Sequence, residues 1–253
     1  MEIKPCNYFV CLIDIMGQKE FFKDIKSPDV SDDIKKNIER VSNGLAEMVR
    51  YATNRYTRLF KGVDVGVELF SDSIIFSLKE TSDKPSYLSV WLEMIVKVVY
   101  IACKYRLPFR GSIVKGLAQR SDSGTIYGDA VDEVIDIEQN ITDSFRIVFS
   151  KELALELESK HSTEYRRFCE RDADFALILN YAGYRIIEKN EFLKERMLLK
   201  DIVVWVKERF DYFCYQGTEE HDQHANPKLA RRFKMWGEYL ELESARKAIE
   251  RYV

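Results

Sequence analysis

The sequence predicts an α+β fold in which helices cover one face of a β-sheet, and two observations indicate this class. Segments with apolar residues in short runs or at every second position alternate with segments whose apolar residues recur every three or four residues. Two strand-like segments are joined by a tight turn and the others through helices, which favours helices packed on a sheet. The 253 residues, 46% hydrophobic and 32% charged, suffice for one such domain and an extension.

The first predicted strand, Tyr8–Asp14, is an apolar run that ends in a carboxylate. A short helix is expected over Gln18–Ile25. Ser31 and Asp32 are typical N-cap residues for a longer helix, whose apolar positions continue at helical spacing to Leu59.

A β-hairpin is expected next. Residues Val63–Leu69 alternate apolar and polar side chains, and Ser73–Leu78 forms a second strand. The dipeptide Ser71-Asp72 between them predicts a tight turn with Asp72 at the tip of the hairpin.

The remaining segments continue the alternation of helices and strands. They are a helix over Pro85–Arg106, a strand over Phe109–Ala118, a helix over Asp129–Gln139, a strand over Phe145–Phe149, a helix over Lys151–Ser159 and a strand over Phe175–Tyr181. Two long amphipathic helices follow over Glu191–Phe213 and Lys228–Tyr252. The sequence therefore predicts one domain over residues 1–190 and a helical C-terminal extension over residues 191–253.

Composition narrows the classes of partner. With 39 basic and 42 acidic residues, the net charge of -3 argues against nucleic acid as the main partner. The N-terminus lacks the pattern of a signal peptide. The longest apolar helix is interrupted by Glu93, Lys97 and Lys104 and does not span a membrane. Five cysteines without a CxxC pair fit a reduced, cytoplasmic protein.

Two carboxylates stand out by their positions at the ends of strands. If the hairpin pairs beside the first strand, Asp14 and Asp72 point to the same end of the sheet. Such a pair binds Mg²⁺ or Mn²⁺ with substrate phosphates completing the shell. Two ions held this way activate an attacking hydroxyl and neutralise a leaving pyrophosphate. Either residue alone is better explained as a strand-end or turn former, but the pair in this topology favours a metal site.

The residues after Asp14 predict a phosphate-binding turn. Ile15, Met16, Gly17 and Gln18 run from the strand into a helix. A strand-to-helix turn with glycine presents backbone N–H groups toward phosphate. We therefore include Met16, Gly17 and Gln18 among the predicted substrate-binding residues.

Four motifs in order, over about residues 7–150, resemble the class III nucleotidyl cyclase family. They are Asp-Ile-x-Gly at Asp14–Gly17, the hairpin aspartate at Asp72, Arg-x-Gly-Ile-x-x-Gly approximated by Arg110–Gly116, and Gly-x-x-Val-Asn approximated by Gly128–Asp132. The resemblance implies a ferredoxin-like βααββαβ core with an antiparallel sheet. It also implies a homodimer with composite active sites, each with two Mn²⁺ or Mg²⁺ ions held by Asp14, the Ile15 carbonyl and Asp72.

The departures from the family pattern favour a pyrimidine substrate. Ser71 and Ser112 replace family glycines, and Glu68 stands where purine cyclases usually carry a base-reading lysine. An ionised Glu68 only accepts hydrogen bonds, so it suits uracil N3–H or cytosine N4–H₂. These changes resemble the uridylate and cytidylate cyclases of Pycsar antiphage defence. That resemblance implies UTP, favoured over CTP, as the substrate and a separately encoded effector protein that responds to the cyclic product.

The family's transition-state asparagine and arginine are replaced here by Asp132 and Asp136. Charge that develops on the α-phosphate needs a cation, for which Arg110, Lys115 and Arg120 are candidates. Arg110 and Lys115 face opposite sides of their strand, so both cannot line one site. A structural salt bridge explains Arg110 equally well, and Lys115 is also explained as a strand-end lysine that extends to water.

The leading hypothesis is in-line attack of the ribose 3′-hydroxyl on the α-phosphorus, with Arg110 as a catalytic residue and Glu68 and Lys115 binding substrate. The alternative is a catalytically silent cyclase-like module that binds nucleotide or dimerises. The missing helix arginine favours this alternative, and the presence of both aspartates counts against it. A diguanylate-cyclase or polymerase-palm relative is disfavoured, because no GGDEF-like turn occurs at the hairpin.

Overall fold

The computed structural model describes residues 5–15, 32–81, 86–142, 145–172, 174–181, 202, 204–207, 234 and 237. The chain divides into two compact units. The first comprises Met1–Thr142 and Arg146–Leu179, and the second comprises Asp143–Phe145 and Asn180–Val253.

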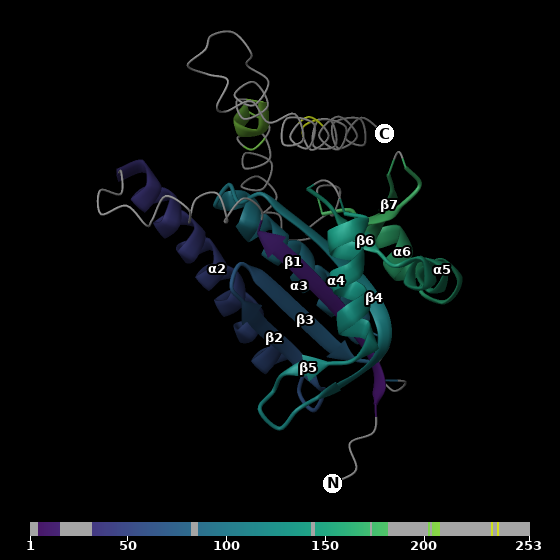
Figure 1. Ribbon diagram of the computed structural model, residues 1–253. Coiled ribbons are helices and arrows are strands. Elements are labelled where there is room, and N and C mark those ends of the chain that lie inside the picture. The colour runs from purple at the N-terminus through teal and green to yellow at the C-terminus, as the bar shows by residue number, and fades with distance from the viewer. Residues whose placement is uncertain are drawn as a thin grey trace. The chain divides into compact units, whose positions relative to one another are not determined.

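The first unit combines a sheet with five described helices, which Figure 1 labels. In chain order its elements are β1 (Cys6–Ile15), α2 (Asp32–Leu59), β2 (Val65–Phe70), β3 (Ser73–Lys79), α3 (Ser86–Lys104), β4 (Phe109–Arg120), β5 (Ile126–Tyr127), α4 (Asp129–Asn140), β6 (Ile147–Phe149), α5 (Lys151–Lys160), α6 (Ser162–Phe168), β7 (Cys169–Arg171) and β8 (Leu177–Leu179).

The strands are arranged in the order β2-β3-β1-β4-β6-β8-β7, and β5 pairs with β4 off this path. Neighbouring strands are antiparallel except β4 and β6, which are parallel. The α+β class is confirmed, but the sheet is mixed and the prediction of an antiparallel sheet is wrong in this respect. The parallel pair follows from connectivity, because α4 carries the chain back across the sheet between β4 and β6.

Helices cover both faces of the sheet rather than one. On one face, the Ser112 hydroxyl of β4 donates to the Val134 carbonyl of α4. On the other, the Trp91 ring of α3 lies 6.3 Å from the Phe9 ring of β1. Phe9 pairs with Lys115, three positions from Ser112, and alternate side chains point to opposite faces. Because the side chains of β1 alternate between the two faces of the sheet and are almost all buried, helices must pack on both faces.

The strongly patterned elements match the predictions to within a few residues. The sequence did not indicate three short elements, namely β5, α6 and β7. A two- or three-residue strand has no measurable period, and only Phe168 is buried in the polar segment that forms α6. The predicted short helix over Gln18–Ile25 lies outside the described residues.

Few residues of the second unit are described, and those at positions 202, 204–207, 234 and 237 are helical. Ile202, Trp205 and Val206 are buried. A Cβ atom added to Gly237 would lie 3.4 Å from Val206 Cγ1, so helical segments pack together there. The predicted boundary at residues 190 and 191 falls outside the described residues and stays a prediction. In the described part of the chain, no helix has the length and apolar character to cross a membrane.

Candidate active site

Backbone pairing brings Asp14 and Asp72 to neighbouring positions at one end of the sheet. Strand β3 pairs with β1 in the register Asp14 to Ser73, the residue directly after Asp72. The Ile15 N–H also donates to the Asp72 carbonyl, with an N–O distance of 3.0 Å. The hairpin therefore pairs beside the first strand, which is the condition that the predicted metal site required.

The hairpin turn consists of Ser71 and Asp72, because Phe70 pairs with Ser73. Ser71 has a φ of 56°, in the left-handed region that non-glycine residues rarely adopt. The family pattern has glycine at this position. The serine is therefore accommodated with backbone strain directly beside a candidate metal ligand.

Two neighbours hold the Asp14 carboxylate. The Ser73 hydroxyl donates to Oδ1 at 2.8 Å, and Arg110 Nε lies 3.5 Å from Oδ2. Arg110 Nε also forms an ion pair with Glu138 of α4, whose side chain is buried. The terminal nitrogens Nη1 and Nη2 of Arg110 have no partner among the described residues. They remain able to donate to an anion.

Ser73 and Glu138 are residues of this site that the sequence did not single out. A serine that follows a turn aspartate has no periodic signal. Glu138 lies on a helix with several acidic residues, and from the sequence these are most simply explained as a solvent-exposed helix surface. Only the three-dimensional structure shows that Glu138 faces the sheet and meets Arg110.

Glu68 lies on the same sheet face as Asp14 and Arg110. It pairs with Ile75 across β2 and β3, and Ile75 pairs with Leu12 of β1, two positions from Asp14. Paired and alternate residues share a face of a sheet. The structure therefore places Asp14, Arg110 and Glu68 on one surface, with β3 between β1 and β2.

Lys115 is not brought together with these residues. It lies on the opposite face of β4, five residues from Arg110. Its Nζ forms ion pairs with Glu80 and Glu156, at 2.6 and 2.7 Å. Burial alone lowers the pKa of Lys115, but the hydrogen bonds to Glu156 and Glu80 outweigh it and the pKa is raised. We therefore leave Lys115 out of the candidate active site.

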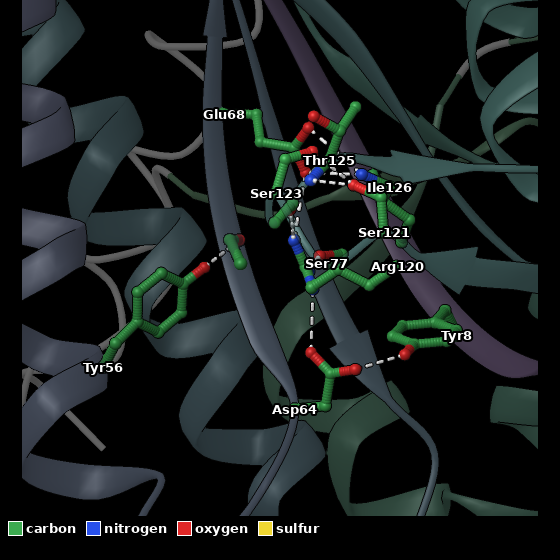
Figure 2. Close-up of polar contacts among 12 residues, drawn as sticks. Tyr8, Tyr56, Asp64, Glu68, Ser77, Arg120, Ser121, Ser123, Thr125 and Ile126 are labelled. Carbon is green, nitrogen blue, oxygen red and sulfur yellow. Dashed lines mark hydrogen bonds and ion pairs between the residues drawn. The ribbon is translucent and has the colours of Figure 1, made fainter. Parts of the chain in front are cut away.

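The Glu68 carboxylate is held by neighbouring donors (Figure 2). The Ile126 N–H donates to both oxygens, at 3.0 Å to Oε1 and 3.2 Å to Oε2, and Arg120 Nη1 donates to Oε1 at 3.1 Å. The side chain is only 14% exposed. Glu68 is thus an acceptor with a fixed orientation.

Arg120 lies at the centre of a polar group that consists of Arg120, Glu68, Asp64, Ser77 and Tyr8. Besides Glu68, its guanidinium contacts Asp64 Oδ1 at 2.8 Å through Nε, the Gly124 carbonyl through Nη1 and the Ser77 hydroxyl through Nη2. Four of its five N–H donors are thereby engaged. As a candidate for the transition-state cation, Arg120 is therefore much less available than Arg110.

The group extends to β1 through Tyr8, whose hydroxyl donates to Asp64 Oδ2. Burial and this hydrogen bond raise the pKa of Tyr8. The phenol therefore stays protonated and continues to donate to Asp64 at physiological pH.

Helix α4 supplies no cation at the positions where the family carries a transition-state asparagine and arginine. Asp132 is exposed, and Asp136 accepts a hydrogen bond from Asn140 at 2.6 Å. Three cationic side chains were considered from the sequence, namely Arg110, Lys115 and Arg120. Of these, Arg110 lies on the same face of the sheet as Asp14 and keeps both Nη groups without a partner among the described residues.

The candidate metal ligands are hard oxygen donors, the kind that a divalent ion binds together with substrate phosphates. Within the described ranges, no group of three or more His, Cys, Asp or Glu residues is arranged to hold a metal. Asp14, Asp72 and the Ile15 carbonyl offer hard oxygen ligands. Mg²⁺ usually binds one or two carboxylates together with substrate phosphates. The predicted phosphate-binding residues Met16, Gly17 and Gln18 lie outside the described residues.

No protein-family model matches the sequence, and no protein of curated function is similar to it in sequence. Solved structures of cyclase domains are similar to the chain. The guanylyl cyclase domain of the RhoGC fusion protein from the aquatic fungus Blastocladiella emersonii, as a monomeric double mutant, has 13% identity and a TM-score of 0.46, covering 70% of this chain and 96% of that one.

Two further structures extend the comparison. The catalytic core of a rhodopsin-guanylyl cyclase with converted specificity, in complex with ATPαS, has 13% identity and a TM-score of 0.45, covering 71% of this chain and 98% of that one. A bacterial light-regulated adenylyl cyclase has 10% identity and a TM-score of 0.42, covering 80% of this chain and 59% of that one.

Proposed function

We propose that the chain is a metal-dependent nucleotidyl cyclase that converts a ribonucleoside triphosphate into a 3′,5′-cyclic nucleotide and pyrophosphate. The observation that carries this proposal is the pairing of β1 with β3, which places Asp14 beside the Asp72 turn. The ordered family motifs between Asp14 and Asp132 support it independently.

The Asp14 and Asp72 carboxylates and the Ile15 carbonyl would hold two Mn²⁺ or Mg²⁺ ions. When bound, such ions lower the pKa of the ribose 3′-hydroxyl and neutralise charge on the pyrophosphate. Ser73 and Arg110 orient Asp14 from both of its oxygens, so the ligand is positioned before the substrate arrives.

Arg110 supplies the positive charge at the phosphates. Its Nε is fixed by Asp14 and Glu138, and the Nη groups extend from this anchored end. In the reaction, the bond from O3′ to the α-phosphorus forms, the bond from the α-phosphorus to pyrophosphate breaks, and the hydroxyl proton passes to water. Arg110 donors aimed at the phosphate oxygens stabilise the charge that develops there.

We propose a pyrimidine substrate, with UTP favoured over CTP, because Glu68 accepts hydrogen bonds and donates none. The uracil N3–H or cytosine N4–H₂ would donate to the free capacity of its carboxylate. Guanine presents two adjacent donors on its Watson–Crick edge, at N1 and N2, which a carboxylate can accept together, whereas adenine presents only one, at N6. The same acceptor therefore makes GTP the second candidate substrate.

The family resemblance extends the proposal to a cytoplasmic homodimer with composite active sites. Its cyclic product would act on a separately encoded effector protein in antiphage defence. Residues from a partner subunit would then complete each site.

The test is incubation of the purified chain with each of the four NTPs and Mn²⁺ or Mg²⁺, with products identified by mass. Cyclic UMP or CMP with release of pyrophosphate supports the full proposal. Cyclic GMP supports cyclase activity and the acceptor role of Glu68 but not the pyrimidine preference. Cyclic AMP as the main product supports cyclase activity and contradicts the pyrimidine preference.

The second candidate function is a catalytically silent module that binds nucleotide or dimerises. It is favoured by Asp132 and Asp136, which place acidic groups where the family carries polar and cationic ones. Saturable nucleotide binding without any cyclic product over long incubation with Mn²⁺ would support this function instead.

A further inference from the structure

The geometry points to Arg120 as a positioning residue that fixes Glu68 and thereby determines which base the chain accepts. The inference rests on the proposed role of Glu68 in base recognition. Arg120 itself need not touch the nucleotide, because its effect is transmitted through the carboxylate that it holds.

Arg120 connects segments that are far apart in sequence. It ends β4, and the turn over residues 121–127, which includes the short strand β5, follows directly. From there its guanidinium reaches Asp64 before β2, Glu68 within β2 and Ser77 within β3. Figure 2 shows the guanidinium between these side chains, with contacts to Asp64 and Glu68 at different nitrogens. One side chain thus holds the turn over residues 121–127 against the β2–β3 hairpin.

The sheet leaves space for this guanidinium at Gly66. A Cβ atom added to Gly66 would overlap Nη1 and Nη2 of Arg120, so any side chain there displaces the guanidinium. The backbone conformation at position 66 does not require glycine, because the φ angle there is not positive. The absence of a side chain at this position therefore serves the placement of Arg120.

Arg120 sets the orientation of Glu68. One guanidinium lies between the carboxylates of Asp64 and Glu68, at 2.8 and 3.1 Å. Its positive charge offsets the repulsion between the two carboxylates. With Arg120 and the Ile126 N–H bonded mainly to Oε1, the second oxygen retains the greater capacity to accept from a base.

Asp64, the other carboxylate that Arg120 contacts, is also held by two neighbours. The Tyr8 hydroxyl donates to Asp64 Oδ2 while Arg120 Nε takes Asp64 Oδ1, so both carboxylate oxygens are bonded. Asp64 therefore cannot rotate away from Arg120 without breaking two contacts. This anchoring is typical of a group whose geometry is set before a ligand binds.

The first test measures positioning without nucleotide. Arg120→Lys keeps the charge but cannot maintain the branched set of contacts, and Gly66→Ala displaces the guanidinium while retaining every charge. In both variants, amide hydrogen exchange at Ile126 should rise about tenfold, because its hydrogen bond to Glu68 is loosened. Arg171→Lys is the matched control, because β7 lies at the opposite edge of the sheet from β2. Unchanged exchange at Ile126 in both variants overturns the inference.

The second test measures base selection in the same proteins. We compare the affinities of the four NTPs in Ca²⁺, which is expected to support binding without turnover, and kcat/KM in Mn²⁺. The ratio between the preferred and the next-best base should fall about tenfold in Arg120→Lys and Gly66→Ala and stay constant in Arg171→Lys. An equal loss for all bases, or no loss, overturns the inference and leaves the proposed cyclase function intact.

The two proposals fail in different ways. Selective binding by the wild type without turnover contradicts the cyclase function, while the affinity ratios still test Arg120. If the wild type binds no nucleotide selectively, base recognition by Glu68 fails and the inference on Arg120 fails with it. Gly66→Ala guards against misfolding as an explanation, because only the far end of a flexible side chain must move.

Discussion

Among single residues, Asp14, a proposed metal ligand, is held in place by its neighbours. Ser73 holds one carboxylate oxygen and Arg110 approaches the other. These contacts orient the carboxylate oxygens, which would bind a divalent ion through their negative charge. The negative charge of the aspartates, rather than their shape, is therefore the property on which activity is expected to depend.

We predict that Asp14→Asn and Asp72→Asn each lower the rate of cyclic product formation by about 100-fold or more, because an amide retains the shape but loses the charge that holds a divalent ion. The measurement is the initial rate over a Mn²⁺ titration. Asp32→Asn is the matched control, because the Asp32 side chain is 86% exposed and makes one long surface contact. Rates that stay within a few-fold of wild type contradict the assignment.

Ser71 gives a prediction about stability at the same turn. Because Ser71 has a φ of 56°, Ser71→Gly removes left-handed strain of about 1–2 kcal/mol and loses part of that gain to unfolded-state entropy. We predict a net increase of about 0.5–1 kcal/mol in the free energy of unfolding, measured by urea denaturation at constant m value. Ser71→Ala keeps the strain and should show no such gain. A loss of stability in Ser71→Gly would show that the turn is not strained.

The sequence predicted the location of the two aspartates and singled out Arg110, but it did not indicate Ser73, Glu138 or the contacts of Arg120. Asp14 and Asp72 follow from a strand end and a hairpin turn, which are local patterns. Glu68 and Arg120 are 52 residues apart, and their contact depends on the turn over residues 121–127 folding back onto β2. No periodic pattern encodes such a contact, so the engagement of Arg120 by four protein groups emerged only from the structure.

At the scale of elements, helix α4 lies against β4 at a point of close approach. A Cβ atom added to Gly116 would lie 3.2 Å from the Cβ atom of Ala130, so the helix and the strand are nearly in contact there. The Ser112 hydroxyl also donates to the α4 backbone at Val134. Because α4 carries Glu138, its distance from the sheet also sets the position of Arg110.

We predict that Gly116→Val destabilises the fold by about 1–3 kcal/mol, because the larger side chain forces α4 away from the sheet. Urea denaturation measures the effect, with Leu117→Val as the control at a side chain that is 49% exposed. The shift of α4 should also lower activity through Arg110. A variant as stable as the control would show that α4 accommodates the side chain without moving.

The elements themselves were predictable to different degrees. Strands β1 to β4 and helices α2 to α4 have long apolar patterns, and the sequence predicts them to within a few residues. The sequence could not predict whether helices cover one face of the sheet or both. The apolar run of the buried strand β1 is compatible with either arrangement. The turn over residues 121–127 contains only the two-residue strand β5, too short for any pattern.

At the scale of the whole molecule, stability should fall in acid. The hydrogen bond from Arg146 lowers the pKa of Asp174, and the hydrogen bond from Tyr105 does the same for Glu47. The unfolded chain then binds more protons than the folded one as the pH falls through about 4, so the free energy of unfolding falls with it. The stabilisation is fully present above the ordinary pKa values of these groups.

We predict that Asp174→Asn reduces the slope of unfolding free energy against pH between about pH 5 and pH 3. Urea denaturation at several pH values measures this slope. Asp122→Asn, a change at an exposed turn aspartate, is the control. An unchanged slope in Asp174→Asn would show that this ion pair does not contribute to the acid sensitivity of the protein.

We propose that Asp14 and Asp72 together hold the ions for cyclisation. This proposal is tested most directly by counting Mn²⁺ ions bound with a 3′-deoxy nucleoside triphosphate, which lacks the attacking hydroxyl, by electron paramagnetic resonance. The wild type should bind about two Mn²⁺ per bound nucleotide, and Asp14→Asn and Asp72→Asn should each bind fewer while Asp32→Asn matches the wild type. The same count in all four proteins would contradict the account.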